Sequence, residues 1–171
     1  QRTGEPAAVL LDEGYLTDVR TAAAGAVCAK LFGPKVATRI GILGTGIQAR
    51  LQLEWLKNVT SCREISVWGR NGERVADYVA DMESQGFRVQ ATRSVAALCE
   101  ACNLIVTTTP SNDPLIEAEM IRPGTHITAV GSDTPSKREL AGGVLAQADV
   151  VVADSISQCR GRGEISRAVK D

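Results

Sequence analysis

Arg39-Ile-Gly-Ile-Leu-Gly-Thr-Gly-Ile-Gln-Ala-Arg50 is the stretch that decides the fold. An apolar run at residues 40–43 leads into the turn Gly44-x-Gly46-x-x-Ala49, and leucines at helical spacing follow it. A glycine-rich turn between a strand and a helix is typical of a dinucleotide-binding domain. Glycine-rich turns also occur as plain connections, so a purely structural turn is the alternative.

Each small residue of this turn has its own task. Gly44 permits the tight change of direction, Gly46 lets the backbone approach a pyrophosphate, and Ala49 keeps the new helix close to the sheet. The free N–H groups and the positive dipole end of the helix then point at the phosphates. We therefore predict that the cofactor contacts Gly44, Thr45, Gly46, Ile47, Gln48 and Ala49.

Composition narrows the class of protein. The chain has 171 residues, of which 44% are hydrophobic and 23% charged, and this is typical of one globular domain. A net charge of -1 without a basic tract argues against nucleic-acid binding, and no apolar run approaches the roughly 20 residues that span a bilayer. With five cysteines and no signal-peptide pattern, we expect a soluble, cytoplasmic protein.

Cys99-x-x-Cys102 has the spacing of a redox or zinc half-site. A closed zinc site needs four ligands, and the sequence offers no second cysteine pair and only one histidine, His126. We therefore expect both cysteines in the core and no metal site. His126 opens an apolar strand, where we expect a structural or hydrogen-bonded role.

After Arg39, short β-rich apolar runs alternate with longer helical stretches. This alternation predicts an α/β fold, a doubly wound parallel sheet of the Rossmann type, preceded by a long helix. The expected strands are 40–43, 64–68, 88–91, 104–108, 126–130 and 150–153. The expected helices are 47–57, 72–85, 94–101, 114–120 and 137–146.

A different element precedes this pattern. We expect an extended segment at 7–11, then a helix that Thr17 caps and that continues to about Leu31. The residues at helical spacing predict its buried stripe as Leu16, Val19, Ala23, Val27 and Leu31. We divide the chain into 1–34, which leads to a substrate and dimerisation lobe largely absent from this sequence, and a dinucleotide-binding domain at 35–171.

In open α/β sheets, ligands collect outside the carboxyl ends of the strands. After the second expected strand, the sequence has Arg70 and Asn71 where NAD-selective domains usually have an acidic residue for the ribose hydroxyls. Because a guanidinium suits a 2′-phosphate, we favour NADP(H) over NAD(H). A solvated surface arginine is the alternative.

Two further strand ends complete the expected cleft. Thr108, Thr109 and Pro110 follow the fourth strand, where the nicotinamide half would lie, and Val130, Gly131 and Ser132 follow the fifth. Asp133 comes next. Its carboxylate could orient an ammonium or move a proton, or it could cap the helix expected near Lys137, and spacing alone leaves both possibilities open.

Arg20 is a candidate for substrate binding. It lies in the first turn after Thr17, where a cation opposes the helix dipole. A bound anion would reverse that penalty, because guanidinium and helix N–H groups would act together on a carboxylate. An ordinary exposed arginine is the alternative.

Together these residues resemble the ornithine cyclodeaminase and mu-crystallin family. The block at 129–140, Ala-Val-Gly-Ser-Asp-Thr-Pro-Ser-Lys-Arg-Glu-Leu, is far more specific than the glycine turn. The other matching segments are 16–24, 41–49, 107–111 and, more loosely, 152–159 with Gly163-Glu164.

The resemblance implies a nicotinamide-dependent oxidoreductase that transfers a hydride at the C–N bond of an amino acid or cyclic imino acid, by ketimine reduction or cyclodeamination. It implies that Arg20 holds the substrate carboxylate, that Asp133 acts on the substrate nitrogen, and that Arg70 accompanies NADP(H). Family members are usually about twice this length and form homodimers through an N-terminal lobe. A non-catalytic, NADPH-dependent small-molecule binding protein of the mu-crystallin type is the alternative function.

Overall fold

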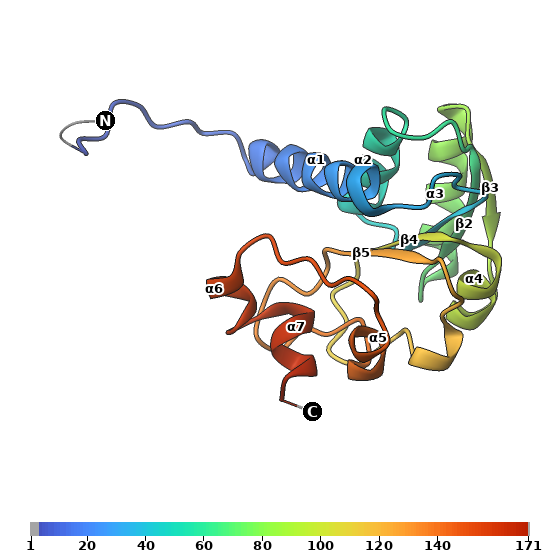
Figure 1. Ribbon diagram of the computed structural model, residues 1–171. Coiled ribbons are helices and arrows are strands. Elements are labelled where there is room, and N and C mark those ends of the chain that lie inside the picture. Colours follow the sequence, from blue (N-terminus) through green and yellow to red (C-terminus); the bar gives the residue numbers. More distant parts are fainter. Residues whose placement is uncertain (1–3, 171) are drawn as a thin grey trace.

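The computed structural model describes residues 4–170 (Figure 1). A five-stranded sheet forms its centre, and helices cover both faces. The elements in chain order are α1 (Tyr15–Phe32), β1 (Ile40–Leu43), α2 (Ile47–Leu56), β2 (Glu64–Trp68), α3 (Gly72–Ser84), β3 (Arg88–Ala91), α4 (Val95–Ala101), β4 (Leu104–Thr107), the 3₁₀ turn η1 (Ala118–Met120), β5 (His126–Ala129), α5 (Gly142–Ala146), α6 (Ile156–Cys159) and α7 (Gly163–Ala168).

All pairings in the sheet are parallel, and the strand order is β3-β2-β1-β4-β5. This confirms the doubly wound α/β fold. The chain runs outward through β2 and β3, then crosses back to the other side of β1 to form β4 and β5. The point between β1 and β4, where the order reverses, is where such sheets bind ligands. The fold therefore places a cleft beside the glycine-rich turn.

The core lies on both sides of the central strand. All four residues of β1 are buried, since helices cover both of its faces. One cluster joins Ile40 and Ile42 to α2 and α3, and the other joins Leu43 to α4. The long apolar runs of the sequence therefore correspond to strands buried on both faces.

The helix α1 begins earlier than the sequence suggests. Its first turn is capped by Asp12, whose carboxylate accepts the Leu16 N–H at 2.7 Å. That bond lowers the pKa of Asp12 below its usual value of 3.8. The prediction that Thr17 caps the helix is therefore wrong, because the aspartate five residues before it already satisfies the free donor.

The face by which α1 packs also differs from the prediction. Its buried residues are Ala22, Gly25 and Ala26, whereas Leu16, Val27 and Leu31 are half or more exposed. Small residues occupy the buried face of α1 because this helix lies directly against α2, as Figure 1 shows. Two helices that approach this closely leave little room for leucine between them.

The predictions of helices at 114–120 and 137–146 are wrong over half or more of each range. Only η1 and α5 are helical there. Instead, the segment 115–116 runs alongside 139–141: the N–H groups of Leu115 and Ile116 donate to the Glu139 carbonyl, and that of Ala141 to the Ile116 carbonyl. Long-range backbone bonds have replaced the helical ones, which local propensity cannot foresee.

The sixth expected strand, 150–153, is also wrong, because these residues form no regular element. Val150, Val151 and Val152 are 66%, 49% and 49% exposed, so the run of valines is not buried in the sheet. β5 therefore ends the sheet on this side, and α5, α6 and α7 gather beside it (Figure 1).

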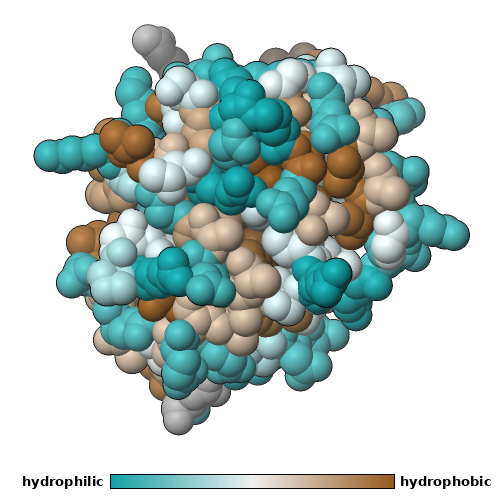
Figure 2. Space-filling model, turned by 90° about the vertical axis from the view of Figure 1, so that its right-hand side faces the viewer, coloured by the Kyte–Doolittle hydropathy of each residue, from teal (hydrophilic) through white to brown (hydrophobic). Residues whose placement is uncertain are grey.

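The opposite sheet edge is β3, where Arg88 and Gln90 are exposed. Arg88 pairs with Glu64 on the neighbouring strand. Charged side chains on an edge strand discourage pairing with other chains. Figure 2 shows this side of the molecule, on which hydrophilic side chains surround smaller apolar areas. None of the helices within residues 4–170 has both the length and the apolar character needed to cross a bilayer.

Candidate functional site

A cleft of about 200 Å³ lies at the carboxyl ends of β1, β4 and β5. It unites residues from three segments that the sequence analysis selected separately: the glycine-rich turn, the threonines after β4 and the block after β5. Its lining residues are Gln48, Thr108, Thr109, Pro110, Val130, Gly131, Asp133 and Lys137. The convergence of these strand ends on one cavity was predicted, and the structure places them so.

The glycine-rich turn has the shape that a phosphate site requires. Gly44 has φ +111°, a value that residues with a side chain rarely adopt, and a Cβ there would lie 2.5 Å from Thr108 Oγ1. At Gly46 a Cβ would meet nothing within 4 Å. The turn is thus pressed against the β4 loop at Gly44 but open in front of Gly46, where α2 begins. These residues fit a dinucleotide pyrophosphate.

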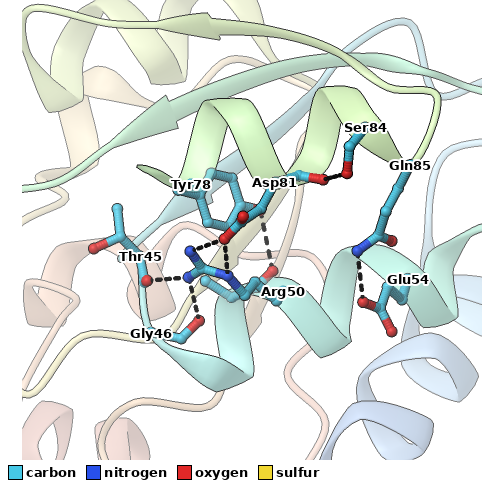
Figure 3. A network of polar contacts seen from close by, with 9 residues as sticks. Thr45, Gly46, Arg50, Glu54, Tyr78, Asp81, Ser84 and Gln85 are labelled. Carbon is cyan, nitrogen blue, oxygen red and sulfur yellow. Dashed lines mark hydrogen bonds and ion pairs between the residues drawn. The ribbon is translucent and has the colours of Figure 1, made fainter. Parts of the chain in front are cut away.

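Arg50 holds the outer side of this turn, as Figure 3 shows. Its guanidinium donates to the Thr45 carbonyl at 2.5 Å and to the Gly46 carbonyl at 3.4 Å. The same group is paired with Asp81 of α3, at 2.9 Å from Nε. With its carbonyls turned toward Arg50, the turn keeps a fixed backbone conformation.

Tyr78 completes this support between α2 and α3. Its ring is fully buried, its hydroxyl donates to the Ala49 carbonyl at 3.1 Å, and the Arg50 guanidinium lies 5.2 Å from the ring centre. Burial raises the pKa of Tyr78 well above its usual value of 10. Neither Arg50 nor Tyr78 was predicted as a site residue from the sequence. The available signal was a cation in the first turn of α2, where the helix dipole disfavours one.

Asp133 lies in the cleft with a side chain 66% exposed, and it is paired with Lys137. Lys137 Nζ donates to Asp133 Oδ1 at 2.7 Å. The alternative that Asp133 caps a helix near Lys137 is wrong, because the next helix, α5, begins only at Gly142. Asp133 therefore presents an ionic group to the cavity instead of supporting a helix, and Lys137 is a cleft residue that the sequence analysis did not select.

Behind the cleft, two carboxylates are buried against the backbone. Glu139 is fully buried and accepts hydrogen bonds from Thr107, Thr109 and Gly131, while Glu164 of α7 accepts from the Glu139 and Leu140 N–H groups. Burial raises the pKa of both carboxyls above the usual value of 4.5. Both occur in segments that carry the family resemblance, yet their spacing gave no sign that they would meet.

The structure does not bring every predicted site residue into the cleft. Arg70 is exposed after β2, and the Asn71 side chain caps α3 by accepting the Arg74 N–H at 2.9 Å. Arg20 is exposed in the second turn of α1, since that helix begins at Tyr15, so the dipole argument for it weakens. The α1 helix nevertheless reaches the cleft through Gln48, which donates to Asp18 of α1.

The remaining predicted turn residues are placed as follows. Ile47 opens α2 with a side chain 60% exposed, Ala49 is fully buried against the sheet, and the Ser132 hydroxyl donates to the Lys137 carbonyl at 2.7 Å. The packing task predicted for Ala49 is confirmed. Ser132 fixes the loop that carries Asp133.

Cys99 and Cys102 are buried in the core, as predicted. Burial raises the pKa of each thiol to about 11, which keeps both protonated and unreactive at neutral pH. His126 is half-buried, and its Nε2 lies 2.8 Å from Thr128 Oγ1. Desolvation lowers the pKa of His126 below 6.5. The hydrogen-bonded position expected for it is confirmed.

Comparison with known proteins adds evidence that is independent of the cleft. The model of the ornithine cyclodeaminase/mu-crystallin family matches residues 1–171. The alanine dehydrogenase of Archaeoglobus fulgidus is 38% identical over 167 residues, which are 98% of this chain and 51% of that protein. The chain spans about half the length of the curated relatives it matches.

Two solved structures share the fold closely. An archaeal alanine dehydrogenase dimer with bound NAD has a TM-score of 0.91 at 37% identity, over 99% of this chain and 52% of that one. The Thermococcus litoralis Δ1-pyrroline-2-carboxylate reductase, in complex with NADH and L-proline, has a TM-score of 0.86 at 28% identity, over 91% and 49% of the two chains. The similarity therefore extends far beyond the glycine-rich turn.

Proposed function

The chain belongs to the ornithine cyclodeaminase/mu-crystallin family, and from that premise we propose that it is the cofactor-binding part of a nicotinamide-dependent oxidoreductase. The reaction would be hydride transfer at the C–N bond of an amino acid or cyclic imino acid. The observation that carries this proposal is the single cleft that joins the glycine-rich turn to the threonines after β4 and to Asp133.

The cofactor would lie along the carboxyl ends of the strands. The open face of Gly46 and the N-terminus of α2 suit the pyrophosphate, because backbone N–H groups and the helix dipole favour an anion there. The segments 108–110 and 130–132 would hold the nicotinamide half. When bound, the nicotinamide supplies or accepts the hydride, and the protein contributes position and electrostatics.

Asp133 would act on the substrate nitrogen. Its carboxylate is exposed to the cleft, so it can bind a substrate ammonium or exchange a proton with an imine nitrogen. Lys137 Nζ, 2.7 Å away, orients this carboxylate until a cationic substrate competes for it. Arg20 would hold the substrate carboxylate. Its exposed position on α1 leaves its side chain accessible to a ligand.

We also propose that NADP(H) is preferred to NAD(H). Arg70 is exposed at the end of β2, beside Asn71, and the four residues 69–72 contain no carboxylate to bind ribose hydroxyls. The two solved neighbours hold NAD or NADH, so the preference rests on Arg70 alone. Replacing Arg70 by Asp should raise the Kd of NADPH and lower that of NADH. An unchanged ratio of the two constants would refute the preference.

We also make three broader proposals about the protein. Residues 1–34 would lead to a substrate and dimerisation lobe, and residues 35–171 would make up the dinucleotide-binding domain. The full-length protein is a homodimer, as the archaeal alanine dehydrogenase neighbour is. It acts in the cytoplasm, where its free thiols at Cys28, Cys62, Cys99, Cys102 and Cys159 would stay reduced.

The test of the function is turnover by the full-length protein. NADPH or NADH is mixed with a panel of cyclic imino acids, and loss of nicotinamide absorbance is followed. Turnover with a member of the panel supports the proposal. Tight cofactor binding without turnover, unchanged in Asp133→Asn, would favour a binding protein of the mu-crystallin type instead. Failure to bind either cofactor would refute both functions.

A further inference from the structure

Glu139 joins the two loops that form one side of the cleft. One carboxylate oxygen, Oε1, accepts the N–H of Thr109 at 2.6 Å, and the other, Oε2, accepts the N–H of Gly131 at 2.9 Å. The Thr107 hydroxyl also donates to Oε2, at 2.7 Å. Thr109 and Gly131 follow β4 and β5 and both line the cleft. A single carboxylate therefore bridges two strands beyond the point where their own ladder ends.

The loops are in close contact at this bridge. A Cβ on Gly131 would lie 2.3 Å from the Thr109 carbonyl oxygen and 2.4 Å from Glu139 Oε2. No side chain fits at Gly131 between the two loops, and the carboxylate of Glu139 ties them together. The separation of the two loops is thus defined from both directions.

A second carboxylate fixes the first. Glu164 in the first turn of α7 accepts the Glu139 N–H at 2.7 Å and the Leu140 N–H at 3.1 Å. It is 9% exposed, while Glu139 is fully buried. Since Glu139 is not on a helix, these bonds hold its backbone in place. The chain from α7 through Glu164 and Glu139 therefore ends at the cleft.

Two buried carboxylates this close together are unfavourable for the fold alone. Burial penalises each charge, and Glu164 makes the charge on Glu139 less favourable still. Apolar residues packed at the same places would satisfy the core better, although they could not accept N–H groups from two loops. An arrangement that costs stability yet fixes cleft geometry points to a functional reason.

We propose that Glu139 is a positioning residue, anchored by Glu164 of α7, which sets the spacing of the loops at 108–110 and 130–133 and so aligns the nicotinamide half of the cofactor with Asp133. The inference rests on the proposed function, because it assumes that a dinucleotide occupies the cleft. It adds that the C-terminal helix α7 controls the geometry of a site that it does not line.

Glu139→Gln tests this with almost no change in size. An amide has one acceptor oxygen, so its NH₂ group must face the N–H of either Thr109 or Gly131, and one loop loses its bond. The glycine-rich turn does not depend on this carboxylate. The variant should therefore bind ADP-ribose within about twofold of wild type, while the Kd of NADPH or NADH rises about tenfold, which is ~1.4 kcal/mol.

Two variants complete the comparison. Glu164→Gln should show the same pattern more weakly, because it acts on the loops only through Glu139. Glu83→Gln changes an exposed carboxylate on α3 and should leave both affinities unchanged. If Glu139→Gln binds both ligands as wild type does, or weakens both equally, Glu139 does not position the nicotinamide half. If the wild type binds neither dinucleotide, the proposed function fails first.

The wild-type protein offers a test that needs no folded variant. Because the amides of Thr109 and Gly131 share one carboxylate, their NMR shifts should titrate together, with a common midpoint above 4.5. Glu164 is the charged group that raises the pKa of this carboxyl further, and the amides of Glu139 and Leu140, which donate to Glu164, report that second carboxyl separately. The amide of Arg74, which donates to the neutral Asn71 side chain, should not follow it. Independent titration of Thr109 and Gly131 would overturn the proposal.

Discussion

Replacing Gly46 by alanine should remove cofactor binding and leave the fold intact. Gly46 has φ −82°, which alanine adopts readily, and an added Cβ would meet no protein atom within 4 Å. Alanine gains about 0.4–1 kcal/mol from a less flexible unfolded chain but loses a similar amount as a poor N-cap. The net change in stability should stay within about 1 kcal/mol, or roughly 2–4 °C in Tm.

The same methyl group projects into the space proposed for the pyrophosphate. It would hold the phosphates away from the free N–H groups of α2, and each lost charge-assisted bond is worth about 1.5–3 kcal/mol. The Kd of NADPH or NADH should therefore rise roughly 10- to 150-fold for each bond lost. Binding is measured by nicotinamide fluorescence and stability by thermal unfolding of the same samples.

Gly44→Ala is the matched control, with the opposite expectation for the fold. At φ +111° a side chain costs about 1–2 kcal/mol, and the Cβ would lie 2.5 Å from Thr108 Oγ1, an overpacking cost of about 1–3 kcal/mol. The Tm should fall by about 4–20 °C. If Gly46→Ala binds cofactor as wild type does, or if it unfolds as early as Gly44→Ala, the placement of the pyrophosphate is refuted.

Three further predictions concern charged residues. Asp133→Asn should lower turnover about 100-fold or more, because the amide cannot exchange the proton, while cofactor Kd stays within about twofold; an unchanged kcat would exclude this role. Arg50→Met should lower Tm by about 2–8 °C because the Thr45 and Gly46 carbonyls lose their donor. Asp81→Asn should lower Tm less, because the Asp81 side chain is 54% exposed. Equal losses of Tm would contradict the view that Arg50 supports the turn mainly through these carbonyls. Burial raises the pKa of Glu139, so its contribution to stability is full below pH 4.5 and is lost as pH rises through the raised value. Relative to Glu139→Gln, which does not titrate at this position, the wild type should therefore gain Tm as pH falls from 7.5 to 5, and parallel curves would contradict it.

The elements that the sequence predicted well are those whose signal is local. β1, the glycine-rich turn and α2 occur within one short stretch, and the predicted helices 72–85 and 94–101 differ from α3 and α4 by one residue at one end. Both helices start after a residue, Asn71 or Ser94, whose side chain accepts a backbone N–H three residues on. Capping and periodicity therefore sufficed, because no distant group competes for the backbone there.

The errors occur where distant groups take the backbone bonds. The first half of the helix expected at 137–146 does not form, because two groups that it would need bond to the segment 115–116: the Ala141 N–H donates to the Ile116 carbonyl, and the Glu139 carbonyl accepts from that segment. On α1, the apolar stripe was predicted from hydrophobicity, whereas contact with α2 selected small residues. Both outcomes depend on partners far away in the chain, which periodicity does not contain.

The same distinction between local and distant partners separates the site residues that were predicted from those that were not. Strand ends predicted which residues share the cleft, because the carboxyl ends of parallel strands always meet at one edge of the sheet. The supports behind it, Arg50, Glu139 and Glu164, stayed unnoticed, since each acts through a side chain that reaches another segment. The residues at strand ends can thus be predicted from the sequence, whereas the side chains that orient them cannot.

The pyrophosphate side and the nicotinamide side of the cleft should consequently be disturbed by different substitutions. The pyrophosphate side is built from the β1–turn–α2 unit and is supported by Tyr78 and Asp81 of α3, so its shape should survive changes in α7. The nicotinamide side depends on Glu139, which a residue of α7 holds from outside the sheet. A substitution in α7 can therefore disturb the reacting half of the cofactor while the phosphates stay bound. Variants of this helix should lose catalysis before they lose affinity for the adenosine half, which distinguishes a positioning defect from a binding defect.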